Sequence, residues 1–512
     1  MASPLFEATL TGLKGWQAGL LALLAGAAMP LAFAPFNFWW LAVLLPAILI
    51  LLWLDCAPRT AAWRGFWFAV GQFGVGTYWL YISIHEFGQA PIWLALLLML
   101  ALVAIMSSYF SLLGYLAARW RMRSRVLVAV LWVPALWTLV EWLRGWFLSG
   151  FSWLSLGYAQ TDSPLGGFAP VAGMYGITLI CMLLAGCCAA VVILPDVRQR
   201  LALLVLPVLM LTGGWWLTSI AWSTVAGPDV RVAIVQGAIP QDEKWLLNNH
   251  DATLVRYRNL TRTAFGTPLI VWPEAAAPDL VNNLGSYFGA LYDEAQSHGS
   301  AIVMGALRTD DAEKNYYNSV LALDNGVRWY DKHHLVPFAE FFPVPGFIRE
   351  WLRLMSLPYS DFTHGAATQP PLAAAGLLLA ASVCYEDAYA ATQLHALLTA
   401  TALVNVTNDA WFGESSARYQ HLQISRLRAM EARRFLVRAA NDGVSAIVDP
   451  YGKIVASAPE FTPTVLRSQL TPLTGLTPFA RSGNLSALGF CCLLLLVCGV
   501  WRRRELLKIE QV

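Results

Sequence analysis

Residues 377–387 read LLLAASVCYED, and this stretch decides how the rest of the sequence is interpreted. Its first seven residues form an apolar run with the length and composition of a buried β-strand. The run stops at Cys384, directly before Tyr385, Glu386 and Asp387. A nucleophile on the sharp turn after a strand is exposed at the sheet edge, and the next backbone N–H can point at a developing oxyanion. The stretch therefore predicts a sheet with a reactive thiol at a strand end.

Two other predicted strands also lead to reactive side chains. The run LIVW at residues 269–272 is followed by Pro273 and Glu274, and a turn at residues 324–326 leads to Lys332. Strand and helix patterns alternate throughout this region, which indicates an α/β layered domain. The predicted strands are residues 230–236, 269–272, 301–307, 319–324, 377–383, 402–406 and 444–448, and the predicted helices are 251–265, 282–298, 390–400 and 418–440. Together these segments supply a thiol, a carboxylate and an amine, a set suited to acyl transfer.

Charged residues are distributed unevenly along the chain. Of 512 residues, 57% are hydrophobic and only 13% are charged, whereas soluble chains carry roughly 25% charged residues. Residues 223–483 hold 20 basic and 24 acidic residues, about 17% of that segment, against about 9% elsewhere. The net charge of +2 is too small to indicate nucleic acid as a partner. We therefore expect an ordinary domain joined to a membrane protein.

Uncharged apolar stretches of about 20 residues, the length needed to cross a bilayer, recur outside that domain. We expect seven membrane spans in residues 1–222, and an eighth span with a basic cytoplasmic tail in residues 484–512. The expected spans are two short ones within residues 15–54, then 65–84, 91–118, 126–146, 166–194, 201–222 and 485–501.

The basic residues predict the orientation of these spans. With the N-terminus in the cytoplasm, 13 of the 14 basic residues outside residues 223–483 lie on the cytoplasmic side, in agreement with the positive-inside rule. The exception is Arg144, which lies three residues after Glu141, so we expect an ion pair there rather than a substrate contact. The domain then lies outside the cytoplasm, and Cys384 is its one cysteine among the eight in the chain. An unpaired thiol in such a compartment favours a reactive role.

Four motifs resemble the nitrilase superfamily: WPE at residues 272–274, YDKHHLVPFAEFFP at 330–343, SVCYED at 382–387 and VNVTNDAWFG at 404–413. With seven spans before the domain and one after it, the whole chain resembles its membrane-embedded branch, the apolipoprotein N-acyltransferase family of Gram-negative bacteria. The resemblance implies an αββα sandwich with a Glu-Lys-Cys triad, which corresponds to Glu274, Lys332 and Cys384. It also implies location in the inner membrane with the catalytic domain in the periplasm.

The resemblance implies a role for each of these side chains. Cys384 is the expected nucleophile, Glu274 the base, and Lys332 the cation that stabilises the oxyanion with the N–H of Tyr385. Glu340 would hold Lys332 in place, and Glu386 would support the site.

The resemblance also implies the substrates. An acyl chain from a phospholipid, phosphatidylethanolamine, forms a thioester and then passes to the α-amine of the diacylglyceryl-cysteine of an apolipoprotein. No metal, cofactor or partner subunit is required, so we expect a monomer.

Apolar residues after the lysine motif suggest how lipid is contacted. Phe341, Phe342 and Phe347 belong to a segment that is very apolar for an external loop, and we expect a mobile arm that dips into the outer leaflet. An ordinary packed cover is the alternative. Trp245 is a candidate for lining the acyl pocket, although a core tryptophan is an equally good interpretation.

Alternatives remain for the residues and for the chain. Taken singly, Cys384 fits a buried small residue, Glu274 a strand-end cap and Lys332 a solvated turn charge. His333 and His334 suggest a metal site, but neighbours in an extended segment point to opposite faces, so structural roles are expected. The whole chain could also be a membrane-tethered amidase with the same triad, or a transporter or receptor with an inactive external domain; the near absence of ionisable residues in the spans argues against the last.

Overall fold

The computed structural model describes residues 13, 15–310, 312, 315–337, 339–341 and 362–510. The chain divides into two compact units. The helical unit comprises Met1–Ile220, Glu414–Gln423 and Ser482–Val512, and the sheet unit comprises Ala221–Gly413 and Ile424–Arg481. The short segment Glu414–Gln423 therefore groups with helices that are far from it in sequence.

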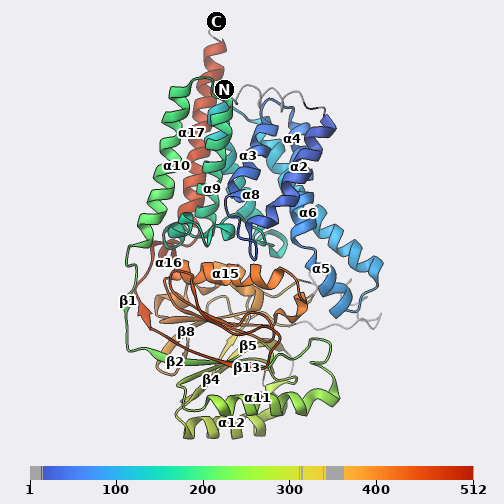
Figure 1. Ribbon diagram of the computed structural model, residues 1–512, viewed down its shortest axis with the longest axis vertical. Coiled ribbons are helices and arrows are strands. Elements are labelled where there is room, and N and C mark those ends of the chain that lie inside the picture. Colours follow the sequence, from blue (N-terminus) through green and yellow to red (C-terminus); the bar gives the residue numbers. More distant parts are fainter. Residues whose placement is uncertain are drawn as a thin grey trace. The chain divides into compact units, whose positions relative to one another are not determined.

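The helical unit consists of long helices that run side by side (Figure 1). The long helices are α2 (Gly15–Ala28), α3 (Leu41–Trp53), α4 (Pro58–Gly76), α6 (Ile92–Arg119), α8 (Val133–Arg144), α9 (Ala169–Ile193), α10 (Val197–Thr218) and α17 (Leu485–Glu510). Short turns α5 (Trp79–Tyr81) and α7 (Arg125–Leu127) precede α6 and α8, and α16 (Pro478–Ser482) precedes α17. A helix is present at each position where a span is expected.

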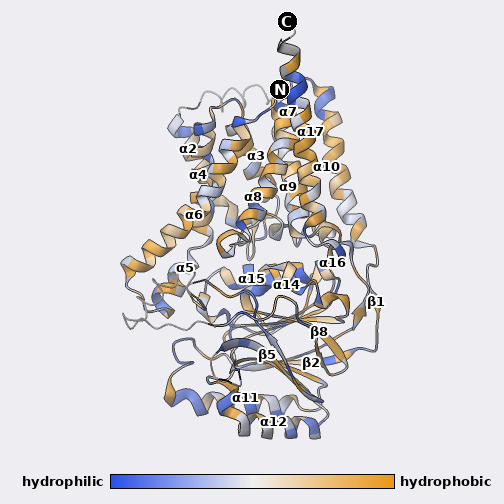
Figure 2. Ribbon diagram, turned by 180° about the vertical axis from the view of Figure 1, so that it is seen from behind, coloured by the Kyte–Doolittle hydropathy of each residue, from blue (hydrophilic) through white to orange (hydrophobic). Residues whose placement is uncertain are grey.

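Six helical stretches among the described residues are long and apolar enough to cross a membrane. They are Gly15–Ala32, Ile92–Arg119, Arg125–Arg144, Pro164–Ile193, Val197–Thr218 and Leu485–Glu505. α3 is apolar but has only 13 residues, and α4 contains two arginines and a glutamine. Apolar residues predominate along these helices (Figure 2), and many of their large side chains are exposed, such as Trp215 on α10 at 72%. Exposed apolar surface of this extent requires lipid around it, so the chain is a membrane protein.

Glu141 and Arg144 form the expected ion pair inside the helical unit. Their side chains are 3.8 Å apart and both are buried. The guanidinium of Arg144 also donates to the carbonyl oxygen of Trp153 at 2.9 Å, and Glu141 accepts from the hydroxyl of Thr178 at 2.6 Å and from the backbone N–H of Leu156 at 3.1 Å. The pair therefore fastens the loop after α8 to its helix.

The sheet unit contains two six-stranded sheets. The first has the order β13 (Thr464–Leu470), β2 (Val230–Gln236), β3 (Leu269–Trp272), β4 (Ala301–Thr309), β5 (Tyr316–Asp324) and β6 (Gly326–Asp331). The second has the order β12 (Ile454–Ser457), β11 (Ala446–Val448), β10 (Leu436–Ala440), β9 (Ala402–Thr407), β8 (Leu377–Val383) and β7 (Leu372–Ala374). Strands β2, β3 and β4 are parallel, as are β8, β9 and β10. β1 (Thr224–Val225) pairs separately with β14 (Leu473–Thr474).

Alternate side chains of the central strands enter two different cores. In β3, Leu269 and Val271 pack in a core shared by both sheets, whereas Ile270 and Trp272 pack with α11 (His250–Ala264) and α12 (Gly285–Ser297) on the other face (Figure 1). A strand buried on both faces has no polar positions, which is why LIVW and LLLAASV are continuous apolar runs. This region thus has the layered, sheet-rich α/β architecture that its alternating strand and helix patterns predicted.

All seven predicted strands are present, whereas one predicted helix is wrong and another is predicted too long at its C-terminal end. Residues 390–400 form only α14 (Ala390–Gln393) and a 3-10 turn (Ala396–Leu398). The second helix, α15 (Ala417–Ala432), ends eight residues earlier than expected, and its predicted tail is strand β10. Strands β6, β7, β12 and β13 were also missed, because they are short or partly exposed edge strands with mixed polarity.

Candidate active site

Cys384 lies on a sharp turn at the end of β8. The strand ends at Val383 and a 3-10 turn, Cys384–Ala388, follows at once. Cys384 has a φ of 52°, in the left-handed region that non-glycine residues rarely adopt. Its carbonyl oxygen accepts a hydrogen bond of 3.2 Å from the amide of Asn405 on the neighbouring strand β9. The expected turn therefore exists, and the fold holds its strained backbone in place.

Glu274 follows β3 and is held through both carboxylate oxygens. Oε1 accepts from the amide of Asn318 at 2.7 Å, and Oε2 accepts from the backbone N–H of Asn408 at 3.0 Å. Gly305 on β4 lies against the backbone of Glu274, where an added Cβ would stand 2.4 Å from its Cα. The side chain of Glu274 is 11% exposed. Its position is thus fixed by three different segments of the sheet unit.

Lys332 follows β6 and is buried beside two carboxylates. Its side chain is 1% exposed, and its Nζ lies 2.9 Å from Oε1 of Glu340 and 3.9 Å from Oε1 of Glu274. Burial by itself lowers the pKa of this ammonium, but the charges of Glu340 and Glu274 outweigh burial, so the pKa is raised above its ordinary value. Lys332 is therefore a cation throughout the physiological range.

Glu340 and Asn318 complete this cluster. Glu340 Oε1 accepts from Lys332 and from Asn318, both at 2.9 Å, and Oε2 accepts from the backbone N–H of Val336 at 2.8 Å. Asn318 lies in β5 and its amide nitrogen bridges Glu340 and Glu274. Sequence reasoning missed Asn318 because the strand was expected to begin one residue later. A polar amide within an apolar strand run was the signal that could have identified it.

Glu386 connects the segment after Lys332 to the segment that carries Cys384. Its Oε1 accepts from the backbone N–H groups of His333 at 2.8 Å and His334 at 3.2 Å, and its Oε2 accepts from Val383 at 3.0 Å. Burial raises the pKa of Glu386, although these N–H groups and the charge of Lys332 oppose the rise. Tyr385 lies between Glu386 and Cys384, with its ring 5.3 Å from that of Tyr389. Glu386 thus sets the spacing between two parts of the site.

The thiol of Cys384 is disfavoured as a thiolate in this environment. Burial raises its pKa most, the negative charge of Glu274 raises it further, and the charge of Lys332 lowers it only in part. The charge of Cys384 in turn raises the pKa of Lys332, so the three groups influence one another electrostatically. The resting form is therefore a protonated thiol next to a carboxylate that can accept its proton.

Lys244 is a second buried amine near the site that sequence reasoning missed. It is 1% exposed, and its Nζ donates to the backbone carbonyl of Glu274 at 3.3 Å. Burial lowers its pKa to about 8, while the charges of Glu274, Asp442 and Cys384 work in the opposite direction. Trp245 beside it is 48% exposed, so it is not a core tryptophan, and its ring centroid lies 5.7 Å from Nζ.

A polar network behind the site was also missed. The amide of Asn408 donates to Gln241 at 2.7 Å, and the amide of Asn441 donates to Asn408 at 3.2 Å. Arg438, at 0% exposure, lies 2.8 Å from a carboxylate oxygen of Asp409 and donates to Asn405, also at 2.8 Å. The motif VNVTNDAWFG thus contributes contacts that position Glu274 and Cys384, which its letters alone do not indicate.

The prediction that His333 and His334 point to opposite faces is wrong. Their ring centroids are only 4.9 Å apart, because the segment after β6 turns instead of continuing as a strand. The ring of His334 packs 4.2 Å from that of Tyr389. Burial lowers the pKa of His334 to about 4, aided by His333 and His364. Across the described ranges, no group of three or more His, Cys, Asp or Glu residues could hold a metal ion.

Of the three phenylalanines expected to contact lipid, the structure describes only Phe341. Phe341 is half-buried, with its ring centroid 5.4 Å from that of His364. Phe342 and Phe347, with the rest of the expected arm, lie outside the described residues.

Comparison with known proteins gives matches for both units. Residues 25–187 match the model of the apolipoprotein N-acyltransferase N-terminal domain, and residues 231–478 match that of carbon-nitrogen hydrolases. An apolipoprotein N-acyltransferase of Methylococcus capsulatus is 39% identical over 490 residues, 96% of this chain and 97% of that protein. Proteins of the same name from Pseudomonas aeruginosa and Coxiella burnetii are 40% and 38% identical and cover 91% and 93% of this chain, and 92% and 99% of their own lengths.

Proposed function

Because this chain belongs to the apolipoprotein N-acyltransferase family, we propose that it moves an acyl chain from a phospholipid to the α-amine of an apolipoprotein through a thioester on Cys384. The observation that carries this proposal is the position of Lys332, 2.9 Å from Glu340 and 3.9 Å from Glu274. A buried cation shared by two carboxylates, close to a thiol on a strained turn, provides a nucleophile, a base and an oxyanion partner.

In the first step, the sulfur of Cys384 attacks the carbonyl carbon of a phospholipid ester. Its proton passes to Glu274, and the charge that develops on the carbonyl oxygen is stabilised by Lys332 and the N–H of Tyr385. The tetrahedral species then expels the glycerol oxygen, which takes the proton from Glu274 and leaves as a lysophospholipid. The raised pKa of Cys384 supports this order, because the thiol must lose its proton as it attacks.

In the second step, the α-amine attacks the thioester carbonyl. Glu274 accepts a proton from the amine nitrogen, the carbon–sulfur bond breaks, and the thiolate of Cys384 takes that proton back. The product is an amide on the N-terminal diacylglyceryl-cysteine. Since the ordinary pKa of an α-amine is about 7.7–8.0, part of the acceptor is already neutral near pH 7 and needs only moderate help from a base.

The substrates and their contacts are part of the proposal. The acyl donor is phosphatidylethanolamine and the acceptor is a diacylglyceryl apolipoprotein, and no metal or cofactor takes part. Trp245 supports a lipid-facing role because almost half of its surface is exposed. Phe341, Phe342 and Phe347 are proposed to contact the same lipids.

The arrangement in the membrane is also a proposal. Residues 1–222 would form seven spans with the N-terminus in the cytoplasm, and residues 484–512 would form the eighth span and a cytoplasmic tail. Residues 223–483 would then form an αββα catalytic domain in the periplasm. The protein would be a monomer anchored in the inner membrane by its spans. The distribution of basic residues supports this orientation, and the core shared by the two six-stranded sheets supports the sandwich.

The intact mass of the protein after incubation with phosphatidylethanolamine tests the chemistry. The wild-type protein should gain one acyl chain and lose it when a diacylglyceryl-cysteine peptide is added. Cys384→Ala should gain none, and Glu274→Gln should acquire the adduct about 10²–10⁴-fold more slowly. Cys492→Ala is the matched control, because Cys492 is an exposed thiol of α17 and the adduct should persist without it.

Two results would contradict the proposal. An adduct that forms equally in Cys384→Ala would place the thioester elsewhere. No adduct on the wild-type protein, together with ammonia released from small amides, would indicate a membrane-tethered amidase instead.

A further inference from the structure

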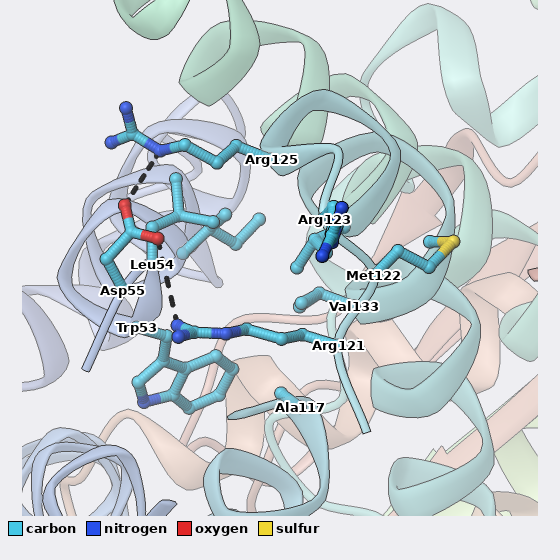
Figure 3. Close-up of a pocket in the computed structure, with 11 residues that line it drawn as sticks. Trp53, Leu54, Asp55, Ala117, Arg121, Met122, Arg123, Arg125 and Val133 are labelled. Carbon is cyan, nitrogen blue, oxygen red and sulfur yellow. Dashed lines mark ion pairs between the residues drawn. The ribbon is translucent and has the colours of Figure 1, made fainter. Parts of the chain in front are cut away.

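A pocket in the helical unit contains basic residues that the acyl-transfer reaction does not use. The pocket has a volume of about 270 Å³ and lies where α3 and α6 end and α7 begins (Figure 3). Arg121, Arg123 and Arg125 line it from the segment between α6 and α7, and Asp55 lines it from the segment after α3. The pocket therefore lies between the segment that follows α3 and the segment that joins α6 to α7.

The charges at the pocket do not balance. Asp55 pairs with Arg125, at 2.8 Å, and with Arg121, at 3.7 Å, as Figure 3 shows. Among the described residues, the guanidinium of Arg123 forms no ion pair, although its backbone N–H donates to the carboxylate of Glu505 at 2.9 Å. Asp55 and Glu505 thus supply two carboxylates beside three guanidiniums, which leaves, among the described residues, an excess of positive charge at the guanidinium of Arg123. Such an excess attracts an anion.

The other walls of the pocket are apolar. Trp53 is 3% exposed and its indole N–H is bonded to the carbonyl oxygen of Ala61 at 2.9 Å, so its ring is fixed. Ala117, Met122 and Val133 are also buried lining residues. These apolar walls do not stabilise a small hydrated anion. A molecule with a phosphate next to apolar groups can instead contact both the arginines and the apolar walls.

We propose that this pocket binds the headgroup of an anionic phospholipid from the cytoplasmic leaflet. The orientation proposed above puts both segments on that side of the membrane. Arginine forks bind phosphate through paired charge-assisted hydrogen bonds, and basic pockets between membrane helices are suited to anionic lipids. The glycerol and upper acyl carbons contact the walls around Trp53. This lipid is distinct from the acyl donor, since the orientation proposed above puts the catalytic side chains on the opposite side of the membrane.

Native mass spectrometry of the full-length protein tests this site. The Cys384→Ala background is used so that no lipid is consumed, and equal amounts of phosphatidylglycerol and phosphatidylethanolamine are offered in detergent. The unaltered pocket should retain phosphatidylglycerol preferentially. Arg123→Gln should lower its retention about tenfold, the usual effect of losing a charge-assisted hydrogen bond. Arg198→Gln, which removes an exposed charge at the start of α10, is the control and should change nothing.

A second variant excludes misfolding as the cause. Asp55 has a φ of 60°, which asparagine tolerates, so Asp55→Asn keeps the backbone and removes the competing carboxylate. It should raise phosphatidylglycerol retention several-fold, which a misfolded protein cannot do.

Three outcomes would overturn the proposal: no preference for the anionic lipid, an equal loss in Arg198→Gln, or displacement of the lipid by an equal concentration of glycerol phosphate. The last would assign the pocket to a soluble phosphate ester. Because the measurement detects bound lipid and not acyl transfer, its failure leaves the reaction proposed for Cys384 untouched.

Discussion

Each unit of the molecule buries a group of opposite charges, and the two groups differ in what surrounds them. In the helical unit, Glu141 and Arg144 bind each other and the backbone and hydroxyl groups of nearby segments. In the sheet unit, Lys332 is shared by Glu340 and Glu274, and the charge of Glu274 raises the pKa of the Cys384 thiol.

We propose that this difference separates buried charges that serve structure from buried charges that serve catalysis. Glu141 and Arg144 fasten a loop to a helix through hydrogen bonds with backbone groups and a hydroxyl. The cluster around Lys332 contains two carboxylates for one ammonium, with a dissociable thiol proton next to it. Burial alone therefore does not identify a catalytic charge; an adjacent group that can gain or lose a proton does.

Replacing the cation in each cluster should separate the two roles most strongly. Lys332→Met should slow formation of the acyl adduct by about 10²–10³-fold, because one oxyanion partner is lost. Arg144→Met should leave the adduct rate of the folded protein within about threefold of wild type. Both variants should lose about 3–5 kcal/mol of unfolding free energy, because each leaves a buried carboxylate without its partner.

The adduct rate by intact mass and the thermal melting of the same samples are the measurements. The comparison fails if Arg144→Met stops adduct formation in folded protein, or if Lys332→Met forms it at the wild-type rate.

Glu340→Gln should have a smaller effect with a distinct pH signature. Glu340 raises the pKa of Lys332, so without its charge Lys332 loses its proton at a lower pH. The reaction needs Lys332 as a cation, so the rate of acyl-adduct formation in a single turnover should decrease at high pH. In Glu340→Gln this decrease should begin at a lower pH, and the rate near neutral pH should be about tenfold below that of wild type. A purely structural role would lower the rate equally at every pH. Glu294→Gln, which removes a partly exposed carboxylate of α12 that pairs with Arg262, should leave the profile unchanged.

Lys244→Met should change the pH dependence of stability. The pKa of Lys244 is about 8 in the folded chain, below its ordinary value of 10.5. Between these values the unfolded chain holds the proton and the folded chain does not, so the free energy of unfolding rises with pH in that window. The variant should lose this rise in melting experiments from pH 8 to 10, whereas Lys453→Met, at an exposed position, should keep it. If the stability of Lys244→Met still rises between pH 8 and 10, the rise must come from another ionisable group.

His334→Gln should give the smallest effect, at acid pH. The pKa of His334 is lowered to about 4, so between pH 6.5 and 4 the unfolded chain takes up a proton that the folded chain refuses. Stability contributed by this residue is therefore lost as pH falls, and the variant should melt with less acid sensitivity in that range. The exposed His298→Gln serves as the control. Equal acid sensitivity in His334→Gln and wild type would contradict this assignment.

The sequence was a good guide to the strands at the centre of each sheet and a poor one at their edges. β2, β3 and β8 are buried on both faces, so their apolar runs stand out. The predicted helix over residues 418–440 was too long, because strand β10 follows α15 almost directly and contains Arg438. From the sequence, Arg438 is expected to be a solvent-exposed charge on a helix. In the structure it is buried, and its guanidinium lies 2.8 Å from a carboxylate oxygen of Asp409. Only the folded chain provides such a partner.

The sequence by itself determined the apolar spans, the strand ends and the identity of Glu274, Lys332 and Cys384 as the candidate site, because periodicity, charge and motif spacing are local properties. The tertiary structure decided what holds these side chains. Asn408 reaches Glu274 from 134 residues away, Asn318 from 44 and Lys244 from 30. Such contacts depend on which strands lie next to each other in the two sheets. Hydrogen bonds and buried charges act over only a few ångströms, so their partners are set by the fold and cannot be found from spacing along the chain.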